Sequence, residues 1–503
     1  MKDRTTKRIA PRIGLFGAAA AMAIMCAAGA YAGPPSSTSV SEQQRLDQLS
    51  GQVGNLVKQS DQSTSEIKKI EQAITVAPPA EANAKPQTVG EHVGLLEKDF
   101  GDLKKDLSDN LGIHVHGLVD AGYEDNLNRP ATANSKGGGP TATGGSLNQL
   151  RVFDPNANSF GLNEGILHID RTTDGGVGFV TDLIFGNTAN VLAQATRYSN
   201  INPAGTSNTI IDPTQFYLTY TVPVGSGINL QVGRFLTLLD EEVVQTNLNY
   251  NETRDYIYGF GSPFTHTGIR AQYTFNDYAG LTLGVNNGWD DVSDANDGKT
   301  VEGQITLNNK DKSLALVFNA IFGPEQVNHS NSKRAVVDPI LTWKPAFVPG
   351  VTLVGEYLYG HESGPVSVMP APSSYGNLMM TFPAFNPSTG TYTINHSVEW
   401  QGAAGYIVYD WSDNLELATR GEWFADPDGA RTGTRQNLSD ITQTISYKIP
   451  GTTGLMARLE YRHDESNAHP FFSSDGFLTP KSVNPLHSYA GQDTITAAML
   501  YSF

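Results

Sequence analysis

The chain has 503 residues, a hydrophobic fraction of 39% and a mean hydropathy of −0.30, so its composition is that of a water-soluble protein. Its formal net charge of −17 argues against nucleic acid and anionic membrane surfaces as partners, because both repel an acidic chain. The sequence has one cysteine, Cys26, so disulfides are not expected to stabilise it.

Residues 1–32 have the three parts of a secretory signal peptide. Five Lys or Arg residues precede the apolar run "IGLFGAAAAMAIMCAA", and the segment ends in an A-x-A cleavage site at Ala32. Removing this segment of net charge +4 takes the chain from −17 to −21 and leaves no cysteine. A retained membrane anchor is disfavoured because the run is short and rich in alanine. Lipidation of Cys26 is disfavoured because Met25 stands where a small residue is needed.

Residues 33–76 are predicted to contain a periplasmic coiled coil. Apolar or small residues recur there at alternating spacings of three and four: Leu46, Leu49, Val53, Leu56, Ser60, Ser63, Ile67, Ile70 and Ile74. This heptad pattern requires partner helices, so it predicts a homo-oligomer, for which we expect a trimer. The alternative is a lone amphipathic helix packed on a globular core, but that helix would have a wider apolar stripe.

Two further segments connect this coil to the rest of the chain. Residues 77–87 are rich in Pro and Ala and are predicted to be a linker, because proline interrupts a helix. Residues 88–111 are predicted to form a second short helix or coil, which Thr88 and Glu91 open as a capping box.

From residue 112 to the C-terminus, apolar and polar residues alternate with a period of two. In "IHVHGLVDAGY", for example, Val119 and Tyr123 fall on one face, whereas His116 and Asp120 fall on the other. Such alternation predicts strands with one apolar and one polar face.

Two features favour a membrane barrel over a soluble sandwich, which alternates too. Short turns such as 223–227 and 276–280 alternate with long loops such as 237–264 and 362–395. Aromatic residues also end the apolar faces at both ends of the strands, where two membrane interfaces would lie. They are Tyr220, Phe275, Trp343, Tyr447 and Tyr501 towards the short turns, and Tyr123, Phe185, Trp289, Phe322, Tyr359, Trp423 and Tyr461 towards the long loops.

The predicted fold is therefore an all-β membrane protein. Residues 112–503 are expected to form an antiparallel transmembrane β-barrel of about 16 strands, preceded by the α-helical coiled-coil segments. The even strand number allows the barrel to close with both ends of the chain in the periplasm.

The C-terminal stretch "GQDTITAAMLYSF" is predicted to be the closing strand. Its alternate residues back from Phe503, beginning with Tyr501, are apolar and would face lipid. A last strand ending in Phe resembles the signal read by the outer-membrane barrel assembly machinery. We therefore expect Phe503 and Tyr501 to form an assembly signal, with that machinery and outer-membrane lipid as partners.

Three blocks of the sequence resemble the OmpL-like family of outer-membrane β-barrel porins. They are "NQLRVFDPNANSFGLNEG" (148–165), "VGRFLTLLDEEVVQ" (232–245) and "YGFGSPFTHTGI" (258–269). The resemblance covers roughly residues 112–503 and implies a channel in the bacterial outer membrane. The N-terminal coils lie outside it and look like the periplasmic stalks that some trimeric porins carry.

In sixteen-stranded porins the third long loop commonly folds into the lumen, and here that loop is acidic (236–264). Opposing arginines would create a transverse field across a narrow aqueous gap, favouring polar solutes and giving mild cation selectivity. The predicted pore-lining residues are Asp240, Glu241, Glu242, Arg254, Asp255, Arg270, Glu302, Glu356, Arg420, Arg458 and Arg462. Glu399, Glu422 and Glu460 are also expected to point inward. The alternative is that the loop stays outside as a solvated lid.

No enzymatic, cofactor or metal site is expected. The sequence lacks a nucleophile elbow, an H-E-x-x-H motif and a P-loop. His114 and His116 share a face, but two neutral ligands make a poor metal site, and "DVSDANDG" (291–298) lacks the EF-hand spacing.

We expect an outer-membrane porin for passive diffusion of small hydrophilic solutes and ions, with its N-terminal segment in the periplasm. One alternative is a structural tether, in which the coils join the outer membrane to the cell wall. No recognisable wall-binding module precedes the coils, which disfavours it. A barrel-embedded hydrolase is the other alternative and lacks a catalytic constellation.

Overall fold

The structure is a computed structural model that describes residues 101–130, 146–171, 176–195, 211–368, 385–386, 391–472 and 488–503. All of them belong to the second of two compact units, Leu95–Phe503. The expected signal peptide, the first coil and the linker lie outside the described residues. Of the predicted second helix, 88–111, only 101–111 is described, and these residues are helical.

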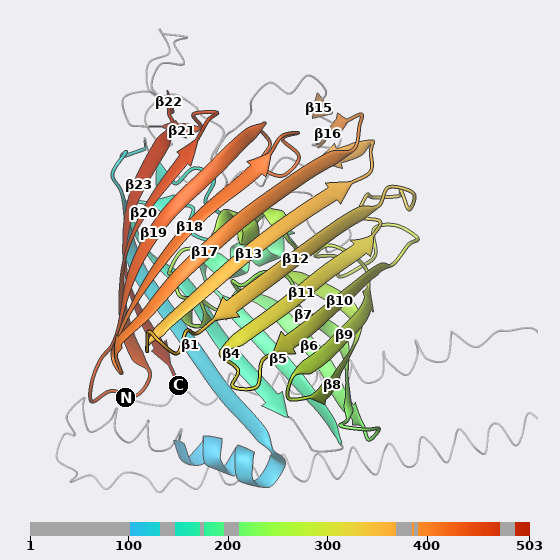
Figure 1. The fold of residues 1–503 in the computed structure, drawn as a ribbon, viewed down its shortest axis with the longest axis vertical. Coiled ribbons are helices and arrows are strands. Elements are labelled where there is room, and N and C mark those ends of the chain that lie inside the picture. The colour runs from blue at the N-terminus through green and yellow to red at the C-terminus, as the bar shows by residue number, and fades with distance from the viewer. Residues whose placement is uncertain are drawn as a thin grey trace, which may run out of the picture. The chain divides into compact units, whose positions relative to one another are not determined.

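Sixteen strands form one closed antiparallel barrel, and this confirms the predicted fold of the region (Figure 1). Neighbours in the barrel follow chain order, and the first strand closes against the last. The strands are β1 Ile113–Asn126, β4 Ser159–Arg171, β5 Val177–Phe185, β6 Ile211–Val222, β7 Ile228–Leu236, β8 Thr265–Asn276, β9 Ala279–Asn286, β10 Thr300–Asn308, β11 Leu314–Gly323, β12 Arg334–Trp343, β13 Val351–Glu362, β17 Val398–Ser412, β18 Leu415–Asp426, β19 Gln436–Lys448, β20 Leu455–Ser466 and β23 Gly491–Ser502.

The long connections lie at the upper end of the barrel in Figure 1, and the short turns and Phe503 lie at the lower end. Small extra strands occur only within the long connections of the described chain. They are β2 Ser146–Leu147, β3 Asn156–Ala157, β14 Val366–Val368, β15 Phe385–Asn386, β16 Thr391–Ile394, β21 Phe471–Phe472 and β22 Ser488–Tyr489. No helix in the described part of the chain is long and apolar enough to cross a membrane.

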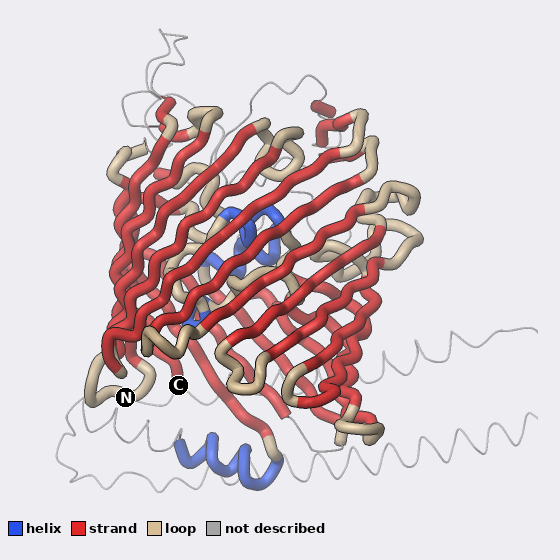
Figure 2. The backbone as a smooth tube through the Cα atoms, in the orientation of Figure 1, coloured by secondary structure: helices blue, strands red, loops and turns tan. Residues whose placement is uncertain are grey.

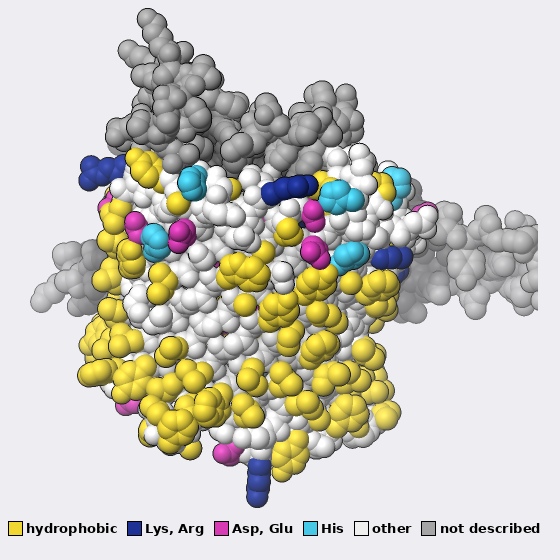
Figure 3. All heavy atoms as spheres, turned by 45° about the horizontal axis from the view of Figure 1, so that its top comes forward, with side chains coloured by type: hydrophobic (Ala, Val, Ile, Leu, Met, Phe, Trp, Pro, Cys, Tyr) yellow, Lys and Arg dark blue, Asp and Glu magenta, His cyan; other side chains and the backbone are white. Residues whose placement is uncertain are grey.

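The alternation of side chains decides which face of each strand turns outward. In β23, Met499 and Tyr501 are exposed on the outer wall, whereas Thr496 and Leu500 are buried inside. Figure 3 shows the result as hydrophobic side chains spread over the outer wall, with charged side chains mostly towards its two ends. An apolar outer band around a polar interior is the arrangement that a lipid bilayer requires.

Two side-chain placements predicted from the sequence differ in the structure. Trp289 was predicted to face outward, but it follows the end of β9 and packs against Trp400 and the guanidinium of Arg334. Glu399 was predicted to face inward, but it is exposed on the outer face of β17. Its neighbour Trp400 takes the inner face and donates a hydrogen bond to the carbonyl of Gly261, at 2.9 Å.

The barrel closes where β1 pairs with β23, and Phe503 extends that pairing beyond the last strand. Its backbone N–H and C=O both bond to Gly117 at 3.0 Å. A Cβ atom at Gly117 would lie 2.1 Å from the Phe503 ring, so only glycine leaves room for this ring. The C-terminal aromatic ring of Phe503 therefore packs against β1, the first strand of the barrel.

The third long connection runs through the inside of the barrel instead of over its mouth (Figure 2). We call residues 237–264 the inner loop. It contains a 3₁₀ turn, η1 Thr246–Leu248, and a π-helical turn, η2 Ile257–Gly261, that packs against β13 and β17. A further helix, α4 Asn187–Ala195, packs against β4, β5 and β6.

Candidate functional site

Carboxylates on the barrel wall bind backbone N–H groups of the inner loop. Glu460 in β20 accepts bonds from the N–H groups of Glu252 and Thr253, at 2.6 and 3.1 Å. Glu422 in β18 accepts those of Tyr256 and Ile257, at 2.9 and 2.8 Å. These charge-assisted bonds satisfy donors that an irregular segment cannot satisfy by itself.

Arginines on the wall bind the carbonyl groups of the same loop. Arg458 donates to the carbonyls of Thr246 and Asn249, at 3.0 and 2.6 Å. Arg462 donates to the carbonyl of Arg254 at 2.5 Å. Wall residues of both signs therefore fix the loop, and the lid alternative, in which it stays outside, is wrong.

Among the predicted pore-lining residues, Glu242 and Arg420 form a direct ion pair at 2.6 Å. Arg420 also pairs with Asp440 at 3.1 Å and is fully buried. The expected aqueous gap between the loop carboxylates and these arginines is therefore wrong for Glu242.

Two of the arginines predicted to line the pore do not oppose the loop carboxylates across a gap, but make other contacts. Arg254 lies in the loop and donates to the carbonyls of Val243 and Glu252, both at 3.0 Å. Arg270 in β8 forms a bidentate pair with Glu302 in β10, at 2.7 and 3.1 Å. It also binds the Leu236 carbonyl at 3.0 Å, just before the loop begins.

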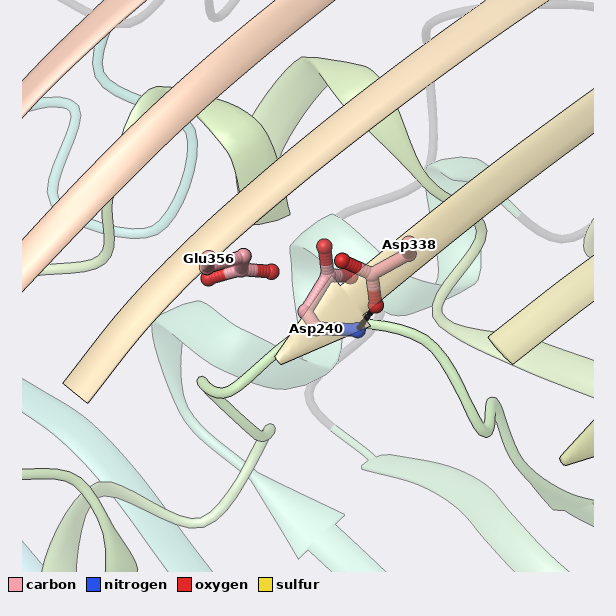
Figure 4. A group of neighbouring side chains, drawn as sticks. All are labelled: Asp240, Asp338 and Glu356. Atoms are coloured by element: carbon pink, nitrogen blue, oxygen red, sulfur yellow. Dashed lines mark hydrogen bonds between the residues drawn. The ribbon is translucent and has the colours of Figure 1, made fainter. Parts of the chain in front are cut away.

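The start of the inner loop meets carboxylates on the wall, not arginines. The N–H of Asp240 donates to Asp338 in β12 at 2.8 Å, and the N–H of Glu241 donates to Glu356 in β13 at 3.3 Å. Figure 4 shows the carboxylates of Asp240, Asp338 and Glu356 gathered at this point. The sequence-based expectation that all loop carboxylates face arginines is therefore wrong here.

Burial changes the proton affinity of the loop carboxylates. Desolvation, followed by the charge of Glu242, raises the pKa of Asp255 to about 7. The same two causes raise the pKa of Glu241 to about 7. Asp255 also accepts a hydrogen bond from the hydroxyl of Tyr406 in β17, at 2.8 Å.

A second connection, the first long loop, also reaches inward, which the sequence pattern did not predict. Arg151 is buried and donates to Asp464 in β20 at 2.8 Å and to Thr494 in β23 at 2.8 Å. The inward aspartates Asp338 in β12, Asp440 in β19 and Asp464 in β20 were not predicted either. The alternation of these strands places all three on inner faces, so that pattern could have identified them.

Several solved structures contain chains similar to this one. They include the channel DcaP of Acinetobacter baumannii (10% identity, TM-score 0.46, 78% of this chain and 97% of that one) and OprB of Pseudomonas putida (9%, 0.49, 80% and 97%). An anion-selective porin from Comamonas acidovorans is similar at 8% identity and a TM-score of 0.45, over 78% of this chain and 99% of that one.

Comparison with curated proteins found no match. A family model described as "Putative beta-barrel porin-2, OmpL-like" matches residues 112–503, which is most of the chain. This family consists of channels and not of enzymes. The chain therefore belongs to the OmpL-like beta-barrel porin-2 family and is a porin-like outer-membrane channel.

Proposed function

We propose that the barrel passes small hydrophilic solutes and ions by passive diffusion, and that the inner loop sets the narrowest part of their path. The observation that carries this proposal is the course of residues 237–264 through the barrel. Wall contacts from β4, β12, β13, β18 and β20 support a fixed narrowing instead of a mobile lid. A path lined by charges and backbone dipoles favours polar solutes over apolar ones.

Single-channel recording in a planar lipid bilayer tests this proposal. Purified full-length protein should give discrete current steps that are proportional to voltage. The fold is checked in the same sample by the shift of the barrel on gels after heating. Folded protein that gives no steps at any voltage would contradict the porin function.

The proposal extends to the N-terminal part of the chain. Residues 1–32 act as signal peptide, and residues 33–76 and 88–111 form periplasmic coils separated by a linker at 77–87. The heptad pattern supports this role, and it favours a homotrimer.

Deletion of residues 41–75 tests the role of the coil in assembly. The deleted chain should show less trimer in mild detergent than the full chain, while its barrel keeps the heat-dependent shift on gels. Equal trimer recovery from both chains would show that the coil does not set the oligomer.

A further inference from the structure

Three carboxylates from distant parts of the chain converge where the inner loop begins. Asp240 belongs to the loop, Asp338 to β12 and Glu356 to β13 (Figure 4). One carboxylate oxygen from each lies within 4.8 Å of the others. The three residues are 9%, 0% and 5% exposed, so bulk water does not compensate their charges.

Each of these carboxylates uses one oxygen for the protein and leaves the other free. Asp338 Oδ2 accepts bonds from the Asp240 N–H and from Asn319 Nδ2, at 2.8 and 3.0 Å. Glu356 Oε1 accepts from the Glu241 N–H, and Asp240 Oδ2 accepts from the Ser262 hydroxyl.

The remaining oxygens are Asp240 Oδ1, Asp338 Oδ1 and Glu356 Oε2. All three are buried and have no hydrogen-bond partner within the described ranges. A buried acceptor without a donor is rare, because it loses its bonds to water without replacing them. Three such acceptors at one point indicate a missing positive partner.

The charged side chains around the cluster do not supply that partner. The charges that act most strongly on Asp240 are those of Asp338, Asp255 and Glu242, which are all negative. Those acting on Glu356 are likewise carboxylates, namely Asp338, Asp240, Asp255 and Glu241. None of the ion pairs in the described part of the barrel includes a member of the cluster.

We propose that Asp240, Asp338 and Glu356 bind one divalent cation of calcium size, which fastens the inner loop to the barrel wall. Carboxylate oxygens are the ligands that such hard cations prefer. Calcium takes oxygens at about 2.3–2.6 Å, so two on opposite sides of the ion lie about 4.6–5.2 Å apart. The three oxygens lie within 4.8 Å of one another, so one calcium ion can reach all of them. Magnesium fits this group less well, because it keeps several of its water molecules and is usually bound by only one or two carboxylates.

The cation would complete the attachment of the loop at its weakest point. Further along the loop, the positive partners are arginines, as in the pairs of Glu242 with Arg420 and of Glu252 with Arg458. Asp240 lies beside two carboxylates of the barrel wall, and these three negative charges repel one another. A cation bound between them attracts all three and so links the loop to the wall. Removing it should loosen the first part of the loop and make the open-channel current noisier.

Direct binding measurements test the site. Full-length protein, refolded into detergent without lipopolysaccharide and stripped with EDTA, is titrated with Ca²⁺ and with Mg²⁺ by calorimetry. We expect saturable binding of Ca²⁺ at one site per chain and weaker binding of Mg²⁺. The variants Asp338→Asn and Glu356→Gln should each weaken Ca²⁺ binding by about tenfold or more.

The matched control is Glu460→Gln. Glu460 also receives backbone N–H groups of the inner loop but lies outside the cluster, so this variant should bind Ca²⁺ like the unchanged protein. Heat-dependent mobility on gels confirms that each variant is folded. The proposal is overturned if the unchanged protein shows no saturable Ca²⁺ binding, or if Glu460→Gln weakens it as much as Asp338→Asn. Because no current is measured, either result leaves the porin proposal intact.

Discussion

Single residues on the inner faces of the strands act mainly by binding the backbone of the inner loop. Alternation in the sequence was enough to predict that Arg420, Arg458 and Arg462 point inward. It could not predict their partners. Arg420 and Glu242 are 178 residues apart, and nothing local in the sequence relates them. Periodicity therefore predicts the direction in which a side chain points, whereas its contact partner depends on the folded barrel.

The packing of the Phe503 ring against Gly117 can be tested by a substitution. We expect Gly117→Ala to reduce the yield of folded barrel and to destabilise it by about 1–3 kcal/mol, because its new Cβ would overlap the aromatic ring. The measurement is the urea midpoint of the folded fraction on unheated gels. Gly355→Ala is the matched control, since nothing lies within 4 Å of a Cβ at this strand glycine. Equal midpoints for the two variants would contradict the proposed fit.

Phe503→Asp tests the separate role of this residue as an assembly signal. A charge in place of the terminal aromatic should lower the amount of barrel in the outer membrane and leave unfolded chain in the periplasm. The conservative variant Phe503→Tyr is the control and should assemble normally. Unchanged outer-membrane levels of Phe503→Asp in fractionated cells would argue against the signal.

At the scale of elements, the inner loop is a segment of irregular backbone that is buried in protein. Such a segment persists inside a barrel only if its polar groups find partners there, and the wall supplies them from several strands. Its sequence predicted an acidic loop of the right length. That sequence could not show the carboxylate cluster at Asp240, because Asp338 and Glu356 come from strands far along the chain.

The buried carboxyl of Asp255 makes the attachment of this loop depend on pH. Its pKa is raised from an ordinary value of 3.8 to about 7, so the folded state binds the proton more tightly than the unfolded state does. Stability therefore falls as pH rises from about 4 to about 7 and changes little above that range. The charged groups around it are Asp240 and Glu242 in the loop, Arg420 and Glu422 in β18 and Glu356 in β13.

We expect Asp255→Asn, which resembles the protonated form, to remove this part of the pH dependence. Urea midpoints of both proteins are compared at pH 5, 6, 7 and 8. The difference should be smallest at pH 5 and should grow in favour of Asp255→Asn towards pH 8. Parallel curves for the two proteins would show that Asp255 does not titrate in this range.

At the scale of the whole molecule, the sequence predicted the closed barrel of sixteen strands, because period-two alternation and turn lengths are local features repeated along the chain. The two side chains whose direction was predicted wrongly, Trp289 and Glu399, have local explanations. Trp289 was read as part of an alternation that ends at Asn286, three residues earlier. Glu399 was assigned inward by its charge, whereas Val398 and Trp400 beside it are both buried inside the barrel.

The overall negative charge bears on ion selectivity, and the structure indicates which carboxylates are free to act. Glu242 is neutralised by Arg420, whereas Glu241 is half buried and, with its pKa raised to about 7, carries part of its charge at neutral pH. Asp410 and Glu416 lie opposite each other on β17 and β18, and they are exposed and half buried, respectively. Arg458 and then Lys448 are the cations that act on Glu416. Burial, then the charges of Glu241, Glu416 and Asp410, raises the pKa of Tyr250 to about 12, so these carboxylates act on one region of the loop.

Replacing these three carboxylates together, by Glu241→Gln, Asp410→Asn and Glu416→Gln, should shift the zero-current potential in a KCl gradient towards anions. The reason is that charges within a Debye length of about 8–10 Å act on the permeating ion. Higher salt should therefore shrink the difference from the unchanged channel. Glu399→Gln is the control, since this carboxylate is exposed on the outer face and should leave the potential unchanged. If the triple variant and the unchanged channel have equal zero-current potentials at low salt, the ion path does not pass these residues.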